Sequence, residues 1–107
     1  MKLNVGDYVR TETGQIGKII YFEGDMVRVD CDKFITYKSN HNEITKISPN
    51  IIDLIEVGDY VNGSLVVNKK LDSIDIIQLI LPFELKEKDI KSVVTKEQFE
   101  QMEYKIN

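Results

Sequence analysis

The chain has 107 residues, of which 42% are hydrophobic and 30% charged, a composition typical of a folded globular protein and not of a disordered segment. The formal net charge is −4, and each half (1–56 and 57–107) carries 7 Lys and Arg against 9 Asp and Glu. This even balance excludes a basic arm and disfavours non-specific nucleic-acid binding, which needs a cationic surface.

Cysteine usage and hydropathy indicate where the protein works. The single cysteine, Cys31, rules out an internal disulfide and is typical of a reducing compartment. The N-terminal residues form no apolar targeting segment, and no run approaches the roughly 20 apolar residues that span a bilayer. We therefore expect a cytoplasmic protein with no membrane partner.

The first half is predicted to form five short strands, because turn residues separate runs rich in β-branched and aromatic side chains. These strands cover 8–10, 15–22, 26–31, 34–38 and 43–47. Gly17, inside the second strand, predicts a bulge or a close approach of two backbones. Ser48 and Pro49 then provide an N-cap and a first helical residue, which predicts a helix of about two turns.

The second half opens on a repeat of the first. Residues 5–9 and 57–61 both read Val-Gly-Asp-Tyr-Val. Asn62-Gly63 then predicts a tight hairpin whose return strand covers 64–67. The apolar run 74–80 is interpreted as the most buried strand of the chain.

The remainder of the second half ends in a helix. Pro82 ends the preceding strand or places it at a sheet edge, and residues 83–88 leave a strand and an irregular loop both open. The segment 89–94 matches the last strand of the first half. Thr95 and Gln98 have the spacing of a capping box, which predicts a helix from Lys96 to about Met102.

Three features therefore recur in the same order: the pentapeptide, a late short strand and a Ser- or Thr-capped helix. We expect a mainly β fold with two tandem, pseudo-repeated units, 1–56 and 57–107, each ending in a short helix. A unit of about 50 residues is near the lower limit for an independent core, so we expect the units to pack on each other. A chance recurrence of the pentapeptide remains the alternative.

Residues 5–30 resemble the opening of SH3-like small barrels, in particular those of the KOW type. The resemblance is carried by Gly6-Asp7-x-Val9, by Gly14-x-x-Gly17-x-Ile19 and by Val27-x-Val29. It covers about a quarter of the chain, and the second half departs from it after Val61. The resemblance implies that each unit is an SH3-like small barrel. It also implies one candidate function, a KOW-like nucleic-acid-binding module.

The chain as a whole also resembles small proteins that phages and prophages of low-GC Gram-positive bacteria encode. The resemblance lies in the richness in Lys, Ile, Asn, Asp and Glu and in the phrase Val-Thr-Lys-Glu-Gln-Phe-Glu at 94–100. Some such proteins block host defence, anti-CRISPR proteins among them. The resemblance implies a protein that binds and modulates a host protein in the bacterial cytoplasm. A structural or virion-assembly component remains a further alternative, and the oligomeric state stays open.

The sequence offers no set of residues that resembles a catalytic or metal site. Cys31 shares a predicted strand face with Val27 and Val29, which is typical of a small core residue, and His41 lies in a polar loop. One Cys and one His are too few ligands for a structural zinc site. The aspartates Asp25, Asp30 and Asp32 lack the spacing of an EF-hand loop. We expect no enzymatic activity, no metal and no cofactor.

A basic and aromatic surface is predicted on the first half. Four cations are expected to project outward from neighbouring strands beside three tyrosines: Arg10, Lys18, Arg28 and Lys38 with Tyr8, Tyr21 and Tyr37. Such a surface suits base stacking and phosphate contacts, and equally a protein hot spot, where Tyr and Arg are enriched. The acidic net charge favours a protein partner. Ordinary exposed strand residues are the alternative.

The C-terminal helix provides a second candidate surface. Glu97, Glu100 and Glu103 form an acidic outer face around Phe99 and Met102. Such a face would mimic phosphate charge toward a nucleic-acid-binding protein. Simple packing of the helix on the core is the alternative.

Overall fold

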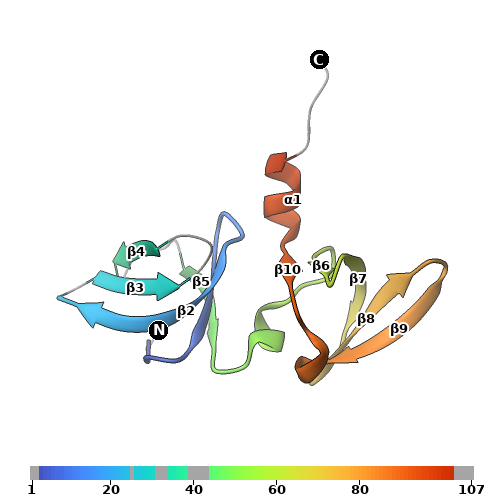
Figure 1. The fold of residues 1–107 in the computed structure, drawn as a ribbon, viewed down its shortest axis with the longest axis horizontal. Coiled ribbons are helices and arrows are strands. Elements are labelled where there is room, and N and C mark those ends of the chain that lie inside the picture. The colour runs from blue at the N-terminus through green and yellow to red at the C-terminus, as the bar shows by residue number, and fades with distance from the viewer. Residues whose placement is uncertain (1–2, 25, 31–33, 39–43, 103–107) are drawn as a thin grey trace, which may run out of the picture. The chain divides into compact units, whose positions relative to one another are not determined.

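The computed structural model describes residues 3–24, 26–30, 34–38 and 44–102, with the backbone alone for 34–38 and 102. The chain divides into two compact units, Met1–Leu54 and Ile55–Asn107. Each contains one antiparallel sheet of short strands, so the protein is mainly β as predicted (Figure 1). The two units are described separately.

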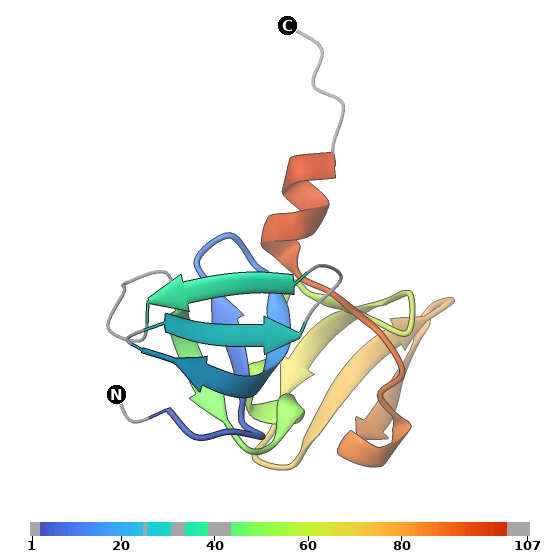
Figure 2. The ribbon, with the colours of Figure 1, turned by 60° about the vertical axis from the view of Figure 1, so that its left-hand side comes forward.

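The first unit is a five-stranded antiparallel sheet with the strand order β4-β3-β2-β1-β5 (Figure 2). Its strands begin and end within one residue of the predicted bounds: β1 (Tyr8–Thr11), β2 (Ile16–Glu23), β3 (Met26–Asp30), β4 (Phe34–Lys38) and β5 (Ile44–Ser48). Strands β4 and β5 are the two edges. In the part of the chain that the structure describes, the sheet is therefore open and does not form a closed barrel.

The core of the first unit lies against one face of this sheet. It consists of five buried aliphatic side chains: Val9, Ile19, Val27, Val29 and Ile44. Strand β3 alternates as predicted, because its two valines enter the core while Arg28 and Asp30 take the opposite face. That opposite face is the one that the sequence analysis assigned to partner binding.

Gly17 allows β2 and β3 to approach each other closely. A Cβ atom at this position would clash with the Val29 side chain and lie 2.7 Å from the carbonyl oxygen of Asp30. The carbonyl belongs to the neighbouring strand, so it cannot rotate away from an added methyl group. The predicted close approach is confirmed. The bulge lies slightly further along β2, where the register shifts between Ile19 and Tyr21.

The predicted two-turn helix after Ser48 is wrong in length. A single 3₁₀ turn, η1 (Ile51–Leu54), takes its place. The Ser48 hydroxyl still caps the turn, since Oγ accepts from the Asn50 N–H at 3.0 Å and donates to Asp53 Oδ2 at 2.5 Å. A second turn has no room, because the Glu56 carbonyl already accepts from the Asp59 N–H at 3.1 Å in the next turn.

The second unit has the strand order β10-β6-β7-β8-β9. Its elements are β6 (Tyr60–Val61), β7 (Ser64–Lys69), β8 (Ser73–Gln78), β9 (Leu81–Lys86), η2 (Glu87–Asp89), β10 (Val93–Val94) and α1 (Lys96–Met102). Read in the opposite direction, the order is β9-β8-β7-β6-β10. It repeats the order of the first sheet, β4-β3-β2-β1-β5, with five added to each strand number. A helical turn follows the last strand in both units.

The two copies of the pentapeptide also make the same backbone hydrogen bonds. In each copy the glycine N–H donates across the sheet, and the aspartate N–H donates to the carbonyl three residues earlier. The bonds are Gly6 to Ile19 (2.9 Å), Gly58 to Val66 (3.0 Å), Asp7 to Asn4 (3.1 Å) and Asp59 to Glu56 (3.1 Å). Both glycines have positive φ, 95° and 101°, which favours glycine at these positions. The repeated sequence therefore has a repeated backbone.

Two further predictions in the second unit are confirmed. Asn62 and Gly63 have φ of 53° and 83° and join β6 to β7 as a tight hairpin. The capping box at the start of α1 is complete, because the Gln98 N–H donates to Thr95 Oγ1 at 3.2 Å and the Thr95 N–H donates to Gln98 Oε1 at 3.1 Å. Local side-chain patterns therefore specified both features.

The prediction of a buried strand over 74–80 is wrong at its C-terminal end. Strand β8 ends at Gln78, and Leu79 and Ile80 turn the chain into β9, where Leu81 pairs with Gln78. The prediction for Pro82 is wrong for the preceding strand, because β8 ends four residues before Pro82 and lies between β7 and β9. Pro82 instead lies within β9, which is itself an edge strand, where a missing N–H is tolerated. Residues 83–88, for which a strand and a loop were both open, divide between β9 and η2.

Candidate functional site

The described residues contain no group of three His, Cys, Asp or Glu side chains placed to hold a metal ion. Cys31 and His41, the one cysteine and the one histidine of the sequence, lie outside those residues. Two surfaces stand out, one on each unit.

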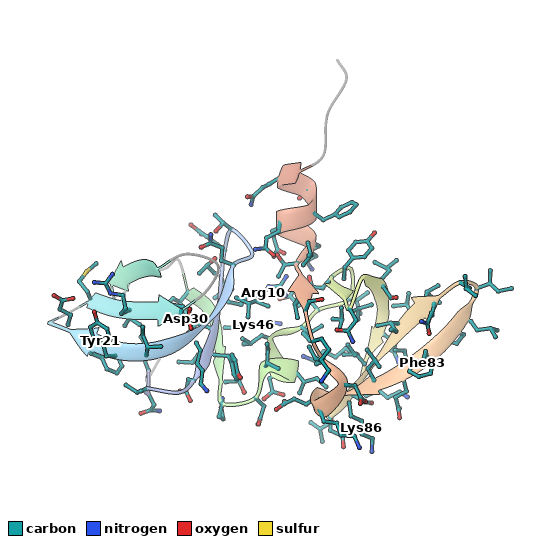
Figure 3. All side chains as sticks on the ribbon, in the orientation of Figure 1. Arg10, Tyr21, Asp30, Lys46, Phe83 and Lys86 are labelled. Atoms are coloured by element: carbon teal, nitrogen blue, oxygen red, sulfur yellow. The ribbon has the colours of Figure 1, made fainter. Side chains whose placement is uncertain are left out.

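The first is the face of the first sheet opposite its core, called here the aromatic-charged face: Tyr8, Lys18, Tyr21, Glu23, Arg28 and Asp30. The β2–β3 register sets Tyr21 opposite Arg28 and Lys18 opposite Asp30, and directly opposite residues share one face. Strand β1 adds Tyr8 opposite Lys18. Figure 3 labels Tyr21 and Asp30 on this unit.

The charged groups on this face are held against its aromatic rings. Arg28 Nε donates to the Tyr21 hydroxyl at 3.2 Å, and the guanidinium carbon lies 5.7 Å from the ring centroid. The same guanidinium reaches Glu23 Oε2 at 3.6 Å. Lys18 Nζ lies 5.6 Å from the centroid of the Tyr8 ring. Both cations are therefore within the range of cation–π attraction.

The charge of the face is mixed. Asp30 lies opposite Lys18 in the register, and Glu23 pairs with Arg28. Each cation described on the face thus has an acidic neighbour, so the cations do not form the continuous positive track that a phosphate backbone needs. The arrangement fits a protein surface better than a nucleic acid.

The prediction that Arg10 projects outward is wrong. The residue is 1% exposed, and its NH1 donates to the carbonyl oxygen of Leu54 at 2.9 Å (Figure 3). Strand β1 is flanked by β2 and β5, and η1 packs against β1. The turn therefore covers a position that strand alternation alone would leave in solvent.

Strand β4 contributes through its register. Tyr37 is opposite Val27, which lies in the core, and Lys38 is opposite Met26. Because opposite positions share a face, the register assigns position 38, and not position 37, to the side of the sheet that carries Arg28. The predicted set of seven residues is thus only partly brought together.

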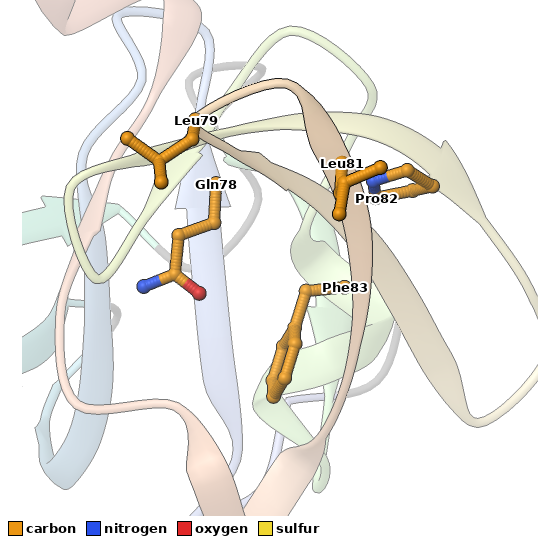
Figure 4. Close-up of a pocket in the computed structure, with 5 residues that line it drawn as sticks. All are labelled: Gln78, Leu79, Leu81, Pro82 and Phe83. Atoms are coloured by element: carbon orange, nitrogen blue, oxygen red, sulfur yellow. The ribbon is translucent and has the colours of Figure 1, made fainter.

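Sequence reasoning missed the second surface, the hairpin tip, defined as Gln78–Phe83 at the β8–β9 turn. Leu79 is 94% exposed, Ile80 88%, Leu81 69% and Phe83 53%. An open hollow of ≈ 490 Å³ lies at the tip and is lined by Gln78, Leu79, Leu81, Pro82 and Phe83 (Figure 4). One feature of the sequence indicates this surface: the uncharged run over 76–83 continues beyond the end of strand β8 at Gln78.

Charged side chains begin immediately below the tip. Lys70 Nζ lies 2.9 Å from Glu84 Oε2 and 3.5 Å from Asp75 Oδ1, and Ser73 Oγ donates to Glu84 at 3.3 Å. The hydrogen bond to Glu84 raises the pKa of Lys70, and the same bond lowers the pKa of Glu84. Lys70, Asp75 and Glu84 together form a charged collar around the base of the hairpin.

Leu79 turns the chain with a positive φ of 62°, a region that costs a non-glycine residue about 1–2 kcal/mol. We expect Leu79→Gly to raise the free energy of unfolding by about 0.5–1 kcal/mol, since glycine relieves the strain at a smaller entropic cost. Urea denaturation measures the change. Leu71→Gly is the control, because Leu71 is 92% exposed without a positive φ. An equal gain in both variants would contradict the assignment of strain to Leu79.

The acidic helix face is only partly described. Glu100 is exposed, Glu97 is half-buried and Glu103 lies outside the described residues. The helix is fixed at its start, where Lys96 Nζ reaches Glu56 Oε1 at 2.8 Å, which raises the pKa of Lys96. Phe99 stacks on Tyr60 with ring centroids 4.8 Å apart. The phosphate-mimic hypothesis stays a prediction.

No protein-family model matches the chain, and no significant similarity to a curated protein or to a solved structure was found. Among the described residues, no helix combines the length and apolar character needed to cross a membrane. Function is therefore argued from the aromatic-charged face and the hairpin tip.

Proposed function

We propose that the protein is a non-enzymatic interaction module that binds a protein partner through the aromatic-charged face of its first unit. The observation that carries the proposal is the Tyr21–Arg28 pair. Tyr21 is 43% exposed, and Arg28 is fixed by the hydroxyl of Tyr21 and by Glu23. Tyr and Arg dominate interface hot spots, and a side chain already held in place loses little rotamer freedom on binding.

The mixed charge supports a protein over a nucleic acid as the partner. A protein surface offers both signs of charge, so Glu23 and Asp30 gain partners as readily as Lys18 and Arg28 do. A phosphate backbone would repel the two carboxylates. The resemblance to phage-encoded proteins makes a host protein the expected partner, and inhibition of a host defence protein is the specific form of this proposal.

We also propose that each unit is a divergent copy of one SH3-like ancestor. The common strand order and the matched hydrogen bonds of the two Gly-Asp turns support a duplication. The edges β4 and β5 leave the first sheet open, so the likeness lies in the strand order and not in closure.

The test is affinity capture of the tagged full chain from nuclease-treated bacterial lysate, read by mass spectrometry. We expect one stoichiometric protein partner, and we expect Arg28→Glu to reduce its recovery at least about tenfold, as loss of a hot spot of about 1.4 kcal/mol or more would do. Lys91→Glu is the control, because it makes the same charge change at an exposed position in the second unit.

Two results would overturn the proposal. Equal recovery with Arg28→Glu and Lys91→Glu would remove the aromatic-charged face from the interaction. Capture of RNA or DNA from untreated lysate, with a steep loss of affinity as salt increases, would identify a nucleic-acid-binding module instead.

A further inference from the structure

The hairpin tip carries apolar side chains on both of its faces and at its apex, with Gln78 as its one polar side chain. Opposite residues of the β8–β9 ladder share a face, so Leu81 and Phe83 lie on one side while Ile77 and Pro82 lie on the other. Leu79 and Ile80 join the two strands at the apex, and Figure 4 labels Leu79 there. A strand pair that packs against a single partner is apolar on one face only. Apolar side chains on both faces instead fit an apolar medium that surrounds the tip. We propose that the hairpin tip inserts into the interfacial region of a lipid surface.

The length of the apolar zone matches this medium. The first charged pair below the apex is Asp75 opposite Glu84, and Gln78 is the one polar side chain within 76–83. From the apex to the Ile76–Phe83 pair the hairpin extends about 10 Å, at about 3.4 Å per residue. Amphipathic segments at membrane interfaces bury their apolar face to about 5–10 Å. The charged collar would then remain at the level of the headgroups.

The backbone of the tip is also suited to an apolar medium. The Lys86 N–H donates to Asp89 Oδ2 at 3.1 Å, away from β8. Strand N–H groups alternate in direction, so positions 84 and 82 of β9 face the same outer edge. Pro82 has no N–H, which removes the edge donor that would otherwise enter the apolar layer without a partner. Figure 3 labels Phe83 within this strand and Lys86 at its C-terminal end.

The same edge argues against other occupants. A strand added to β9 would find no donor at Pro82 and a donor already bound at Lys86, so sheet extension is disfavoured. A second copy meeting this one through the tip would contribute only Gln78–Phe83, against about 20–30 residues per side in a standard interface. We expected no membrane partner because the sequence has no apolar run long enough to span a bilayer. Insertion of a hairpin tip into the lipid surface does not require a membrane-spanning segment.

The test uses the full chain and vesicles of zwitterionic phosphatidylcholine, with sedimentation to measure the bound fraction. We expect the wild type to co-sediment with the vesicles. Ile80→Asp should lower the partition coefficient at least about tenfold, since a charge replaces an aliphatic side chain that the wild type would insert into the lipid. Leu71→Asp is the matched control and should bind like the wild type, because Leu71 is comparably exposed in a different turn. Circular dichroism confirms that both variants are folded.

A second readout reports the site directly. The chain has no Trp, so Phe83→Trp places the only Trp of the variant on the tip. With excitation that is selective for Trp over Tyr, we expect a blue shift of its emission with vesicles and quenching by brominated lipid. Because Lys70, Asp75 and Glu84 sum to one negative charge, anionic lipid should give no gain in binding.

Three outcomes would overturn the proposal: no co-sedimentation of the wild type, equal binding by Ile80→Asp, or an unchanged Trp spectrum. Analytical ultracentrifugation that finds a dimer abolished by Ile80→Asp, without vesicle binding, would assign the tip to self-association. None of these outcomes bears on the aromatic-charged face, so the two proposals fail separately.

Discussion

Arg10→Ala is expected to lower the free energy of unfolding of the first unit by about 3 kcal/mol. The side chain is 1% exposed, and its guanidinium donates to the Leu54 carbonyl at 2.9 Å. Truncation removes a charged hydrogen bond, leaves that carbonyl without this donor and opens a cavity as long as the lost stem. Hydrogen exchange followed on peptides from each unit measures the loss where it occurs, because one global transition need not report on one unit.

Arg28→Ala is the matched comparison, since it removes the same side chain from the same sheet on its exposed face. We expect its cost to be about 0.5–1 kcal/mol, the range of exposed ion pairs and cation–π contacts. Arg10→Met should lower the free energy of unfolding by less than Arg10→Ala and by more than Arg28→Ala. Methionine fills most of the volume of the aliphatic part of the arginine side chain but donates no hydrogen bond. If Arg10→Ala were as mild as Arg28→Ala, the contact with Leu54 would not stabilise the unit.

Asp59→Ala is expected to destabilise the second unit by about 3 kcal/mol. The residue is fully buried, and its two carboxylate oxygens accept from the Glu56 N–H at 2.7 Å and the Lys96 N–H at 2.9 Å. Bonds to a charged group contribute about 1.5–3 kcal/mol each. The carboxylate therefore joins the turn that opens the unit to the first residue of α1. Urea denaturation with exchange on α1 peptides measures both effects.

The repeat supplies the control for this substitution. Asp7 occupies the same place in the first copy of the pentapeptide, but it is half-buried. Its carboxylate accepts from the Asn4 side-chain amide at 3.5 Å, the one hydrogen bond of this side chain among the described residues. We expect Asp7→Ala to cost less than about 1 kcal/mol. Equal losses for the two variants would show that the shared backbone turn, and not the bonds to α1, determines the cost.

Strand positions were predictable where local chemistry determines them. The alternation of Val27 and Val29 with Arg28 specified the faces of β3, and Asn62-Gly63 and the Thr95–Gln98 box specified a turn and a helix start. In each case the signal lies within a few residues and the tertiary structure agrees with it. The positive φ shared by Gly6 and Gly58 explains why the repeated pentapeptide was the most informative feature of the sequence.

The errors arose where distant segments override local preference. Arg10 alternates correctly as an outward residue, and the 3₁₀ turn over 51–54, which packs against its strand and accepts its hydrogen bond, contributes to its burial. Leu79-Ile80 carries none of the Gly, Asn, Asp or Pro residues that mark turns, so the hairpin was read as a longer strand. The exposed tip was therefore interpreted as core, because hydrophobicity alone does not distinguish a buried strand from an apolar surface.

The hairpin tip has a further consequence for the protein at high concentration. Ile76–Leu81 is an uncharged, β-prone six-residue segment of the kind that stacks into amyloid-like fibrils. Asp75 precedes it and Pro82 follows it, which is the gatekeeper arrangement that limits such stacking. The positive φ of Leu79 bends the segment at its centre, so it is not continuously extended. The hairpin therefore carries an aggregation-prone segment that runs through its apex, and the flanking Asp75 and Pro82 limit the stacking of that segment into fibrils.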